Sequence, residues 1–402
     1  MTERLYYNDP YLLEFDAVVT KVQTGESGQE IWLDQSAFYP TSGGQPYDWG
    51  TIGGKTVRNV EVREGDVVHT IDGALCEGET VHCSIDSVRR RDHMQQHCGE
   101  HMLAYLVWKN FGGFTHGLHI GEEFSSIDVT MPDGQTHLSD EQLIALEEEW
   151  NDWIERDEQV KCWFPDDEEL ASLPMRKDSS VKEHIRIVHN APDEYVACGG
   201  THPRSTGEIG CGRILDAKPS RGKMRLSFLC GMRAVRDNRK KTDQCLAAAE
   251  LLSAQWTGLA DAVQKLIAKN AELTSQMRYL QRDSAAMQIE RAYLSAKAAP
   301  DGKKIVTACF ADMDMAAMRE AAGAAAEAYD CYVLAASQNE NGAVLSFVRG
   351  ATCTIAMGKL LSETAKANGG KGGGRPDFAQ GSAQNAQEAI AFAADRLAAG
   401  QE

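Results

Sequence analysis

A seven-residue repeat of large apolar side chains occupies the middle of the chain. The spacing predicts a continuous helix over 246–294 with an a/d seam of the kind found in coiled coils. A second position, four residues after each repeat residue, is mostly apolar as far as Met277, and Asn270 at this position would favour one register. Such a seam predicts pairing of two copies, an antiparallel helical arm, or a long helix packed on its own protein. The repeat residues are Leu252, Leu259, Leu266, Leu273, Leu280, Met287 and Leu294.

The regions on either side of the repeat have different patterns. Residues 1–86 alternate apolar and polar residues between glycine-rich turns, which predicts a small β-barrel or sandwich domain. Residues 87–240 combine long helical stretches with short strands, which predicts an α+β domain. A helical domain over 241–298 and an α/β domain over 299–402 complete the chain. The expected fold class is therefore a multidomain α+β protein.

The chain carries a formal net charge of −18, which argues against nonspecific coating of DNA. The charge is uneven, because residues 121–170 hold 17 acidic and 2 basic side chains, whereas residues 213–241 hold 10 basic and 2 acidic ones. A basic stripe of this kind favours a phosphate backbone bound at one defined place, or else it is a solvated face. Its cations include Arg221, Lys223, Arg225, Arg233 and Arg236.

The sequence predicts a cytoplasmic protein. It has no run of 18 apolar residues that would span a membrane, and its first residues lack the basic and apolar regions of a signal peptide. The 11 cysteines are odd in number and widely scattered. They therefore favour reduced thiols, some of them metal ligands, over a disulfide framework.

Two pairs of metal-binding side chains share the same spacing. His97 and His101 lie four residues apart in a helical stretch, so both imidazoles can reach one ion. Cys198 and His202, in CGGTH, form the second pair. Together the pairs predict a zinc site rather than merely buried cysteine and histidine. Four protein ligands fill a structural tetrahedral site, whereas a catalytic zinc generally keeps a position for water or substrate, and the spacing leaves both arrangements open.

Two glycine-rich segments stand out. The segment Thr41–Pro46, TSGGQP, predicts a tight turn. The segment Gly369–Ser382, GGKGGGRPDFAQGS, predicts a glycine-rich loop in which backbone amides, Lys371 and Arg375 could hold phosphates, or a merely flexible loop. It lacks the GK[ST] ending of the nucleotide-hydrolase phosphate loop.

Four of these segments together resemble a known family. RRRDHMQQHCGEH at 89–101, CGGTH at 198–202 and AFYPTSGGQP at 37–46 are similar to the editing motifs of alanyl-tRNA synthetases, and GGKGGGRPDFAQG at 369–381 is similar to their C-Ala domain. The motifs also occur in the family's order. The large class II aminoacylation domain of those synthetases has no room in this sequence. The chain therefore resembles the long-form AlaX family of free-standing editing proteins.

The resemblance implies a barrel, a zinc-containing editing domain, a coiled-coil helix and a C-Ala domain. It implies a zinc-dependent hydrolase that deacylates Ser-tRNA(Ala), with Gly-tRNA(Ala) as a further candidate substrate, and that does not aminoacylate. The expected partners are mischarged tRNA(Ala) and a second copy bound through 246–294. The alternative from a different class is a tRNA-binding module with a purely structural zinc; a synthetase fragment is disfavoured, because the sequence has no class II ATP-binding segment.

The resemblance also assigns residues. It makes His97, His101, Cys198 and His202 the Zn²⁺ ligands. Two positions depart from the family's motif: Glu100 stands where Thr or Gln is usual, and Cys98 stands where Thr is common. The Glu100 carboxylate would act as a base, assist the metal shell or point away from the site. Thr41, Ser42 or Glu100 would select the serine hydroxyl. The catalytic candidates are Glu100, Gln45 and His119; the substrate-binding candidates are Thr41, Ser42, Gly43, Gly44 and Thr201; the tRNA-binding candidates are Arg221, Lys223, Arg225, Lys371 and Arg375.

Overall fold

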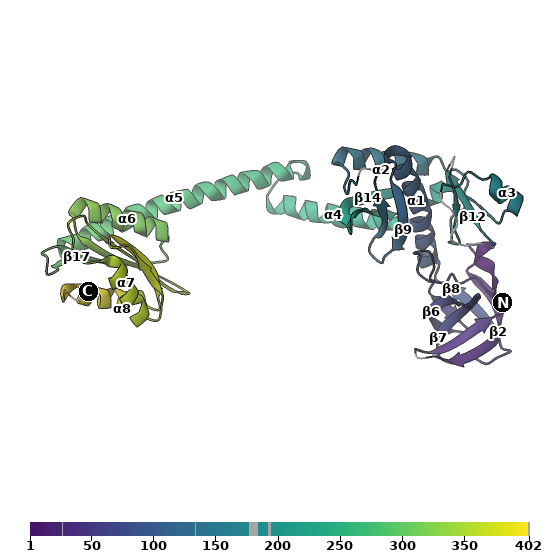
Figure 1. The fold of residues 1–402 in the computed structure, drawn as a ribbon, viewed down its shortest axis with the longest axis horizontal. Helices are drawn as coiled ribbons and strands as arrows, with labels where there is room; N and C mark the ends of the chain where they lie inside the picture. The colour runs from purple at the N-terminus through teal and green to yellow at the C-terminus, as the bar shows by residue number, and fades with distance from the viewer. Residues whose placement is uncertain (26, 133, 177–183, 192–193, 401–402) are drawn as a thin grey trace. The chain divides into compact units, whose positions relative to one another are not determined.

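The computed structural model describes residues 1–402 except 26, 133, 177–183, 192–193 and 401–402. The chain forms two compact units, Met1–Cys245 and Leu246–Glu402 (Figure 1). The finer boundaries expected after 86, 240 and 298 stay predictions. In the described part of the chain, no helix has a segment long and apolar enough to cross a membrane.

The first unit begins with a closed six-stranded barrel, one of the two folds expected for this region. Its strands pair in the order β2-β3-β7-β6-β5-β8, and every neighbouring pair is antiparallel. Alternate residues point inward and form an aliphatic core that includes Val19, Ile31 and Val60, all fully buried. The strands are β2 (Glu14–Thr24), β3 (Gln29–Leu33), β5 (Gly50–Ile52), β6 (Lys55–Arg63), β7 (Asp66–Asp72) and β8 (Thr80–Ile85); β1 (Glu3–Arg4) pairs with β4 (Gln35–Ser36) beside it.

A long central helix, α1 (Ser87–Phe111), follows the barrel. Asp86 caps its first turn by accepting from the backbone amides of Val88 and Arg89, and Gly112 ends it in a left-handed conformation. Every residue from His93 to Val107 is buried, so the polar side chains of this stretch face protein rather than solvent.

Two sheets and helix α2 pack around α1, and a short helix, α3, follows β11. The four-stranded sheet has the order β14-β15-β10-β9, and the three-stranded sheet has the order β11-β12-β13. Ser139 and Gln142 form a capping box at the start of α2. The elements are β9 (Phe114–Ile120), β10 (Ser125–Thr130), α2 (Asp140–Glu155), β11 (Lys161–Trp163), α3 (Asp167–Ser172), β12 (Ile187–Ala191), β13 (Glu194–Ala197), β14 (Gly212–Ser220) and β15 (Lys223–Cys230).

The second unit is a three-layer α/β domain. Its sheet has the order β16-β17-β18-β19-β21-β20. Helices α5 and α6 pack on one face of the sheet, and α7 and α8 pack on the other. The elements are α5 (Leu259–Leu294), β16 (Lys297–Ala298), β17 (Lys304–Ala311), α6 (Met315–Tyr329), β18 (Tyr332–Asn339), β19 (Gly342–Arg349), α7 (Met357–Ala367), β20 (Gly372–Gly374), β21 (Phe378–Ala383) and α8 (Ala386–Ala398).

The prediction of one continuous helix over 246–294 is wrong. Helix α4 (Met232–Leu251) ends before Leu252, and α5 begins only at Leu259 after a short 3-10 turn at Trp256–Gly258. Ser253 has a φ of 50°, a left-handed conformation that no α-helix contains. The first repeat residue therefore lies in the break, and the heptads continue along α5 alone.

The prediction of a glycine-rich loop over 369–382 is also wrong. Most of this segment forms the β20–β21 hairpin at the edge of the sheet. Its glycines allow close backbone contact: a Cβ on Gly372 would meet the Gly381 Cα at 2.6 Å, and one on Gly370 would meet the Ser382 carbonyl at 1.9 Å. The glycines therefore serve a tight strand pairing rather than flexibility.

Candidate metal centre

Four side chains from two separate segments converge inside the first unit. His97 and His101 project from α1, and Cys198 and His202 come from the segment after β13. One ligand atom from each residue lies within 4.8 Å of those of the other three. The Cys198 Sγ is 3.3 Å from the His97 Nε2 and 3.5 Å from the His202 Nε2. Ligands of a tetrahedral zinc ion are roughly 3.3–3.8 Å apart, so this group could hold such an ion.

The chemistry of the donor set also fits a metal. Burial lowers the pKa of His97 to about 3, and it holds the pKa values of His101 and His202 well below the usual range. The three imidazoles are therefore neutral at physiological pH, which is the form that binds metals. The Nδ1 atoms of His101 and His202 are buried and have no hydrogen-bond partner among the described residues. Three imidazoles and one thiol are a donor set that zinc prefers.

A buried arginine, which no motif in the sequence marks, holds the CGGTH segment. The Arg186 Nη1 donates to the Cys198 carbonyl at 3.1 Å and to the Gly200 carbonyl at 2.9 Å. Burial raises the pKa of the Cys198 thiol to about 12, and the Gly200 amide and the Arg186 charge partly oppose this shift. Gly200 lies against the His97 ring, where a Cβ would come within 2.1 Å of the ring. Only a residue without a side chain fits here.

Gln45 connects the barrel to the four-residue group. It is fully buried, its Oε1 lies 2.8 Å from the His97 Nδ1, and its Nε2 donates to the Thr201 hydroxyl at 2.9 Å. Its Oε1 acts as the acceptor, which keeps the proton on the His97 Nδ1 and leaves the Nε2 free toward Cys198. Gln45 is therefore placed to orient the His97 imidazole, and its expected catalytic role stays a prediction. Thr201, also fully buried, takes part in the same network.

Replacing Gln45 with leucine keeps the bulk of the side chain but removes its hydrogen bonds to His97 and Thr201. We expect zinc affinity to fall about 10- to 100-fold, because groups behind metal-bound histidines typically contribute that much. Competition with a chromophoric chelator measures the change. Gln23→Leu, at an exposed barrel glutamine, is the matched control. An unchanged affinity in the Gln45 variant would refute the positioning role.

The rest of the barrel loop packs against β9. The Gly44 carbonyl accepts from the Ile120 amide at 3.0 Å, and a Cβ on Gly44 would meet the Leu118 carbonyl at 1.9 Å. Gly44 has a φ of +85°, and Gly43 has a φ of +58°. These glycines thus make a tight turn and a close contact between barrel and sheet. Thr41 and Ser42 are exposed beside them.

The other two catalytic candidates, His119 and Glu100, differ in their exposure and in their position relative to the four-residue group. His119 is an exposed residue on β9 and is not one of the four converging residues. Glu100 is largely buried next to the group, with its Oε2 3.8 Å from the His101 Nε2. It also lines a small cavity beside His101.

Acidic side chains compensate some of the positive charges in the basic stripe at 213–241. Arg225 pairs with Asp128 at 2.7 Å, and Arg233 pairs with Asp92 at 2.6 Å. Arg221 and Lys223, at the β14–β15 turn, have no ion-pair partner within 4.0 Å in the described part of the chain. In the second unit, Lys371 and Arg375 flank β20, and Arg375 lies 3.3 Å from Asp377.

Comparisons with known proteins cover both units. Residues 3–89 match the family described as class II (A) tRNA synthetases, and residues 301–399 match the DHHA1 domain. The alanyl-tRNA editing protein AlaX-L of Pyrococcus horikoshii is 29% identical over 406 residues, which cover 97% of this chain and 96% of that protein.

Alanine–tRNA ligases match over part of their length. That of Halobacterium salinarum is 36% identical over 267 residues, 62% of this chain and 28% of the ligase. That of Archaeoglobus fulgidus is 32% identical over 401 residues, 95% of this chain and 42% of the ligase. This chain therefore spans less than half of the ligases that it matches. Among solved structures, the C-Ala domain of Aquifex aeolicus alanyl-tRNA synthetase aligns with 26% of this chain at 20% identity and a TM-score of 0.24.

Proposed function

Because the chain belongs to the long-form AlaX family of alanyl-tRNA editing proteins, as its motifs predicted, we propose that it hydrolyses the ester bond of mischarged tRNA(Ala). The substrate would be Ser-tRNA(Ala), with Gly-tRNA(Ala) as a further candidate, and the products free tRNA and amino acid. The observation that carries the proposal is the convergence of His97, His101, Cys198 and His202 beside a barrel loop.

These four residues would hold Zn²⁺. When bound, zinc would polarise the ester carbonyl or lower the pKa of water to about 7. The chain's own contribution is orientation of the donor groups: Gln45 fixes the His97 tautomer, Arg186 holds the Cys198 segment, and burial keeps the imidazoles neutral. Glu100, Thr41 and Ser42 are the candidates for contact with the substrate, because they are the polar residues beside the group or on the exposed loop next to it.

Comparing two charged tRNAs tests the proposal. We expect the protein to deacylate Ser-tRNA(Ala) and to spare Ala-tRNA(Ala), because a site that hydrogen-bonds a substrate hydroxyl strongly rejects the analogue lacking it. Release of labelled amino acid measures both rates. We also expect no alanine-dependent ATP–pyrophosphate exchange. Equal loss of both amino acids would refute the selectivity.

A tRNA-binding module with a structural zinc is the second candidate function. The convergence of four protein donors favours it, since four ligands complete a structural tetrahedral site. A zinc-replete protein that binds tRNA(Ala) and leaves Ser-tRNA(Ala) intact would establish this alternative.

We further propose that tRNA(Ala) is held at cationic surfaces on both units. The first comprises Arg221 and Lys223, which form no ion pair within 4.0 Å among the residues that the structure describes. Arg225 contributes less, because Asp128 compensates it. The second comprises Lys371 and Arg375 beside the glycine hairpin. The overall charge of −18 makes such local concentrations necessary for binding a polyanion.

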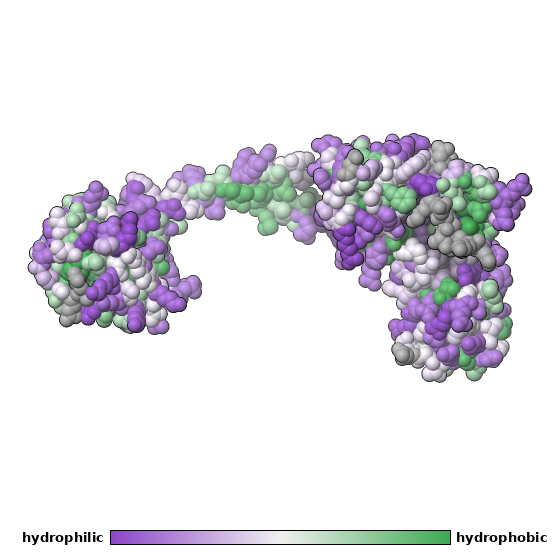
Figure 2. All heavy atoms as spheres, viewed as in Figure 1, coloured by the Kyte–Doolittle hydropathy of each residue, from purple (hydrophilic) through white to green (hydrophobic). Residues whose placement is uncertain are grey.

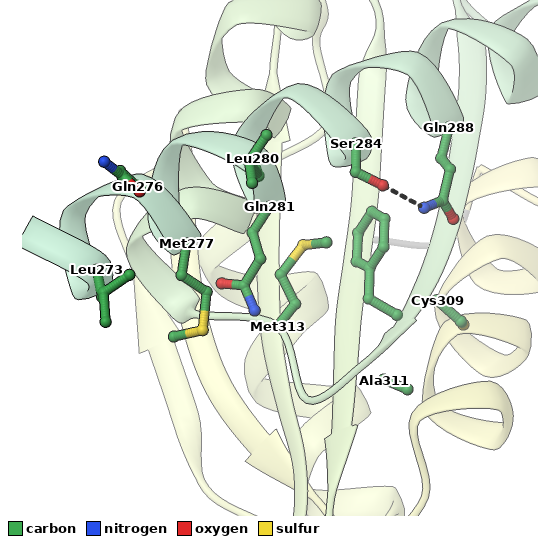
Figure 3. A pocket seen from close by; sticks show the side chains of 11 residues that line it. Leu273, Gln276, Met277, Leu280, Gln281, Ser284, Gln288, Cys309, Ala311 and Met313 are labelled. Carbon is green, nitrogen blue, oxygen red and sulfur yellow. Dashed lines mark hydrogen bonds between the residues drawn. The ribbon is translucent and has the colours of Figure 1, made fainter.

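The homodimer is proposed to form through α5. Leu266, Leu273 and Leu280 are 51–66% exposed, so the second unit itself does not bury the repeat there. Figure 2 shows apolar residues gathered along this helix. Farther along, a groove of about 610 Å³ runs between α5 and the β17–α6 connection, lined by Leu273, Met277, Leu280 and Met313 (Figure 3). A second copy would cover this apolar surface.

Leu266→Glu with Leu273→Glu is expected to convert the dimer to a monomer, because four buried carboxylates would face an apolar seam. Light scattering should fall from twice 44.0 kDa to 44.0 kDa. Ala268→Glu with Ser275→Glu adds the same charge on the opposite face of the helix and should leave the dimer intact. A wild type that is already monomeric would contradict the proposal.

A further inference from the structure

Three consecutive arginines near the start of α1 have three different surroundings. Arg90 is buried and pairs with Asp48. Arg91 is exposed and lines a separate cavity. Arg89 is half-buried and lies against the barrel, with its guanidinium carbon over the Trp49 ring, 4.0 Å from the centre of the ring. Neither the proposed metal centre nor the two proposed cationic surfaces use Arg89.

The barrel fixes the orientation of the Arg89 guanidinium. Its Nε donates to the Tyr47 carbonyl at 3.0 Å, and the Trp49 ring supports its flat face. The Asp86 amide donates to the Trp49 carbonyl at 2.8 Å and so holds this barrel segment against the start of α1. The Nη1 and Nη2 groups of Arg89 form no hydrogen bond with any residue that the structure describes. A guanidinium held in this way loses little side-chain entropy when both groups bind an anion.

The positive charge of Arg89 has no counterion of its own. Two carboxylates act on it from nearby, but each is bound to another arginine. Asp48 pairs with Arg90 at 2.5 Å, and Asp92 pairs with Arg233 at 2.6 Å. Within the described part of the chain, Arg89 has no ion-pair partner within 4.0 Å. Partial burial of this excess charge lowers the pKa of Arg89, and a bound anion would balance it.

The position of Arg89 relative to the metal centre selects the anion. Arg89, His93 and His97 follow one another at four-residue intervals, so they lie along one side of α1. Eight residues of α-helix span about 12 Å. A nucleic-acid strand carries a phosphate about every 3.4 Å when its bases are stacked, and at wider intervals when it is extended. If an ester on the terminal ribose lies at the four-residue group, Arg89 is therefore roughly two to four phosphates away from it.

We propose that Arg89 binds a backbone phosphate in the single-stranded 3′ end of the charged tRNA. The inference rests on the proposed deacylase function and adds a substrate-binding residue to it. A guanidinium binds a phosphate through two parallel N–H···O hydrogen bonds, which the two Nη groups can donate. Such a contact carries no sequence information, but it fixes the register of the last nucleotides relative to the four-residue group.

Binding of two non-hydrolysable probes tests the assignment without turnover. The first probe is the trinucleotide pCpCpA with a 3′-serylamino group in place of the ester. The second has the same bases and the same serylamino group, but it has methylphosphonate links and no 5′-phosphate, so its backbone is uncharged. Titration calorimetry on the zinc-loaded protein gives both dissociation constants.

We expect the wild type to bind the charged probe at least about 10-fold more tightly than the uncharged probe. Arg89→Ala should weaken binding of the charged probe about 10- to 100-fold, because its hydrogen bonds to an ionised phosphate are lost. The affinity of this variant for the uncharged probe should stay at the wild-type value, which shows that the rest of the site is intact.

Arg91→Ala is the matched control. It removes the same charge from the same helix, but two residues along α1, where the side chain points to another side. It should retain the wild-type preference for the charged probe. Equal affinity of the wild type for the two probes would overturn the proposal, as would an unchanged preference in Arg89→Ala. Equal weakening of both probes in Arg89→Ala, or the same loss of preference in Arg91→Ala, would also overturn it.

Deacylation assays separate this inference from the function on which it rests. If the wild type hydrolyses Ser-tRNA(Ala) but Arg89→Ala keeps the preference for the charged probe, the deacylase function stands and the phosphate contact is wrong. If the preference depends on Arg89 but the wild type hydrolyses no Ser-tRNA(Ala), the phosphate contact stands and the deacylase function is wrong.

Discussion

Replacing Cys198 and His202 together with alanine is expected to abolish stoichiometric zinc binding. The wild type should contain about one zinc per chain, because four donors converge on one point. Removing two of four ligands should weaken the affinity by at least about 10³-fold, since structural zinc sites owe roughly 10–16 kcal/mol to a complete ligand set. Elemental analysis after dialysis measures the zinc content, and the rate of Ser-tRNA(Ala) deacylation should fall with it.

The matched control removes the same residue types elsewhere in the first unit. Cys76 and His119 are both exposed and lie outside the four-residue group. The Cys76→Ala, His119→Ala variant should keep wild-type zinc. Zinc that persists in the Cys198→Ala, His202→Ala variant would refute the assignment of the ligands.

Arg90→Ala is expected to produce a large loss of stability. Arg90 is 2% exposed and joins α1 to the barrel through Asp48, at 2.5 Å, and through the carbonyls of Pro10 and Ala37. Removing the guanidinium leaves the buried Asp48 carboxylate without its counterion. The expected cost is about 3–5 kcal/mol in the free energy of unfolding.

Denaturant unfolding followed by tryptophan fluorescence measures this cost, because six of the seven tryptophans precede Leu246 and report on the first unit. Arg58→Ala is the control. Arg58 pairs with Asp72 at the same 2.5 Å, but both side chains are more than half exposed. Water screens the charges of such a pair, so the unfolding midpoint of the Arg58→Ala variant should stay close to that of the wild type. Similar midpoints for the two variants would contradict the argument from burial.

The sequence predicted the parts of the site that depend on local spacing. Two pairs with a four-residue spacing selected the four converging residues. For His97 and His101 this spacing places both side chains on one side of α1, whereas Cys198 and His202 converge in a segment without helical structure. The roles of Gln45 and Arg186 depend on tertiary contacts: Gln45 meets a histidine 52 positions away, and Arg186 meets carbonyls on the next strand connection. No sequence pattern marks such contacts.

Both incorrect predictions of the fold arose because the residue pattern does not show the backbone conformation or the neighbouring strand. The heptads gave no sign of the break at Ser253, because apolar spacing continues through it while the backbone turns left-handed. The glycines of 369–382 were expected in a loop, because glycine weakens an isolated strand. At the sheet edge, however, β21 lies so close that only glycine fits opposite it.

The proposed hydrolytic centre is the group of His97, His101, Cys198 and His202, which could hold a metal ion. The most direct test measures Ser-tRNA(Ala) deacylation against zinc occupancy in one preparation that is stripped with a chelator and reloaded in steps. We expect the rate to rise in proportion to bound zinc, from near zero to the full rate at one zinc per chain. A folded, stripped protein that deacylates as fast as the reloaded protein would contradict the claim.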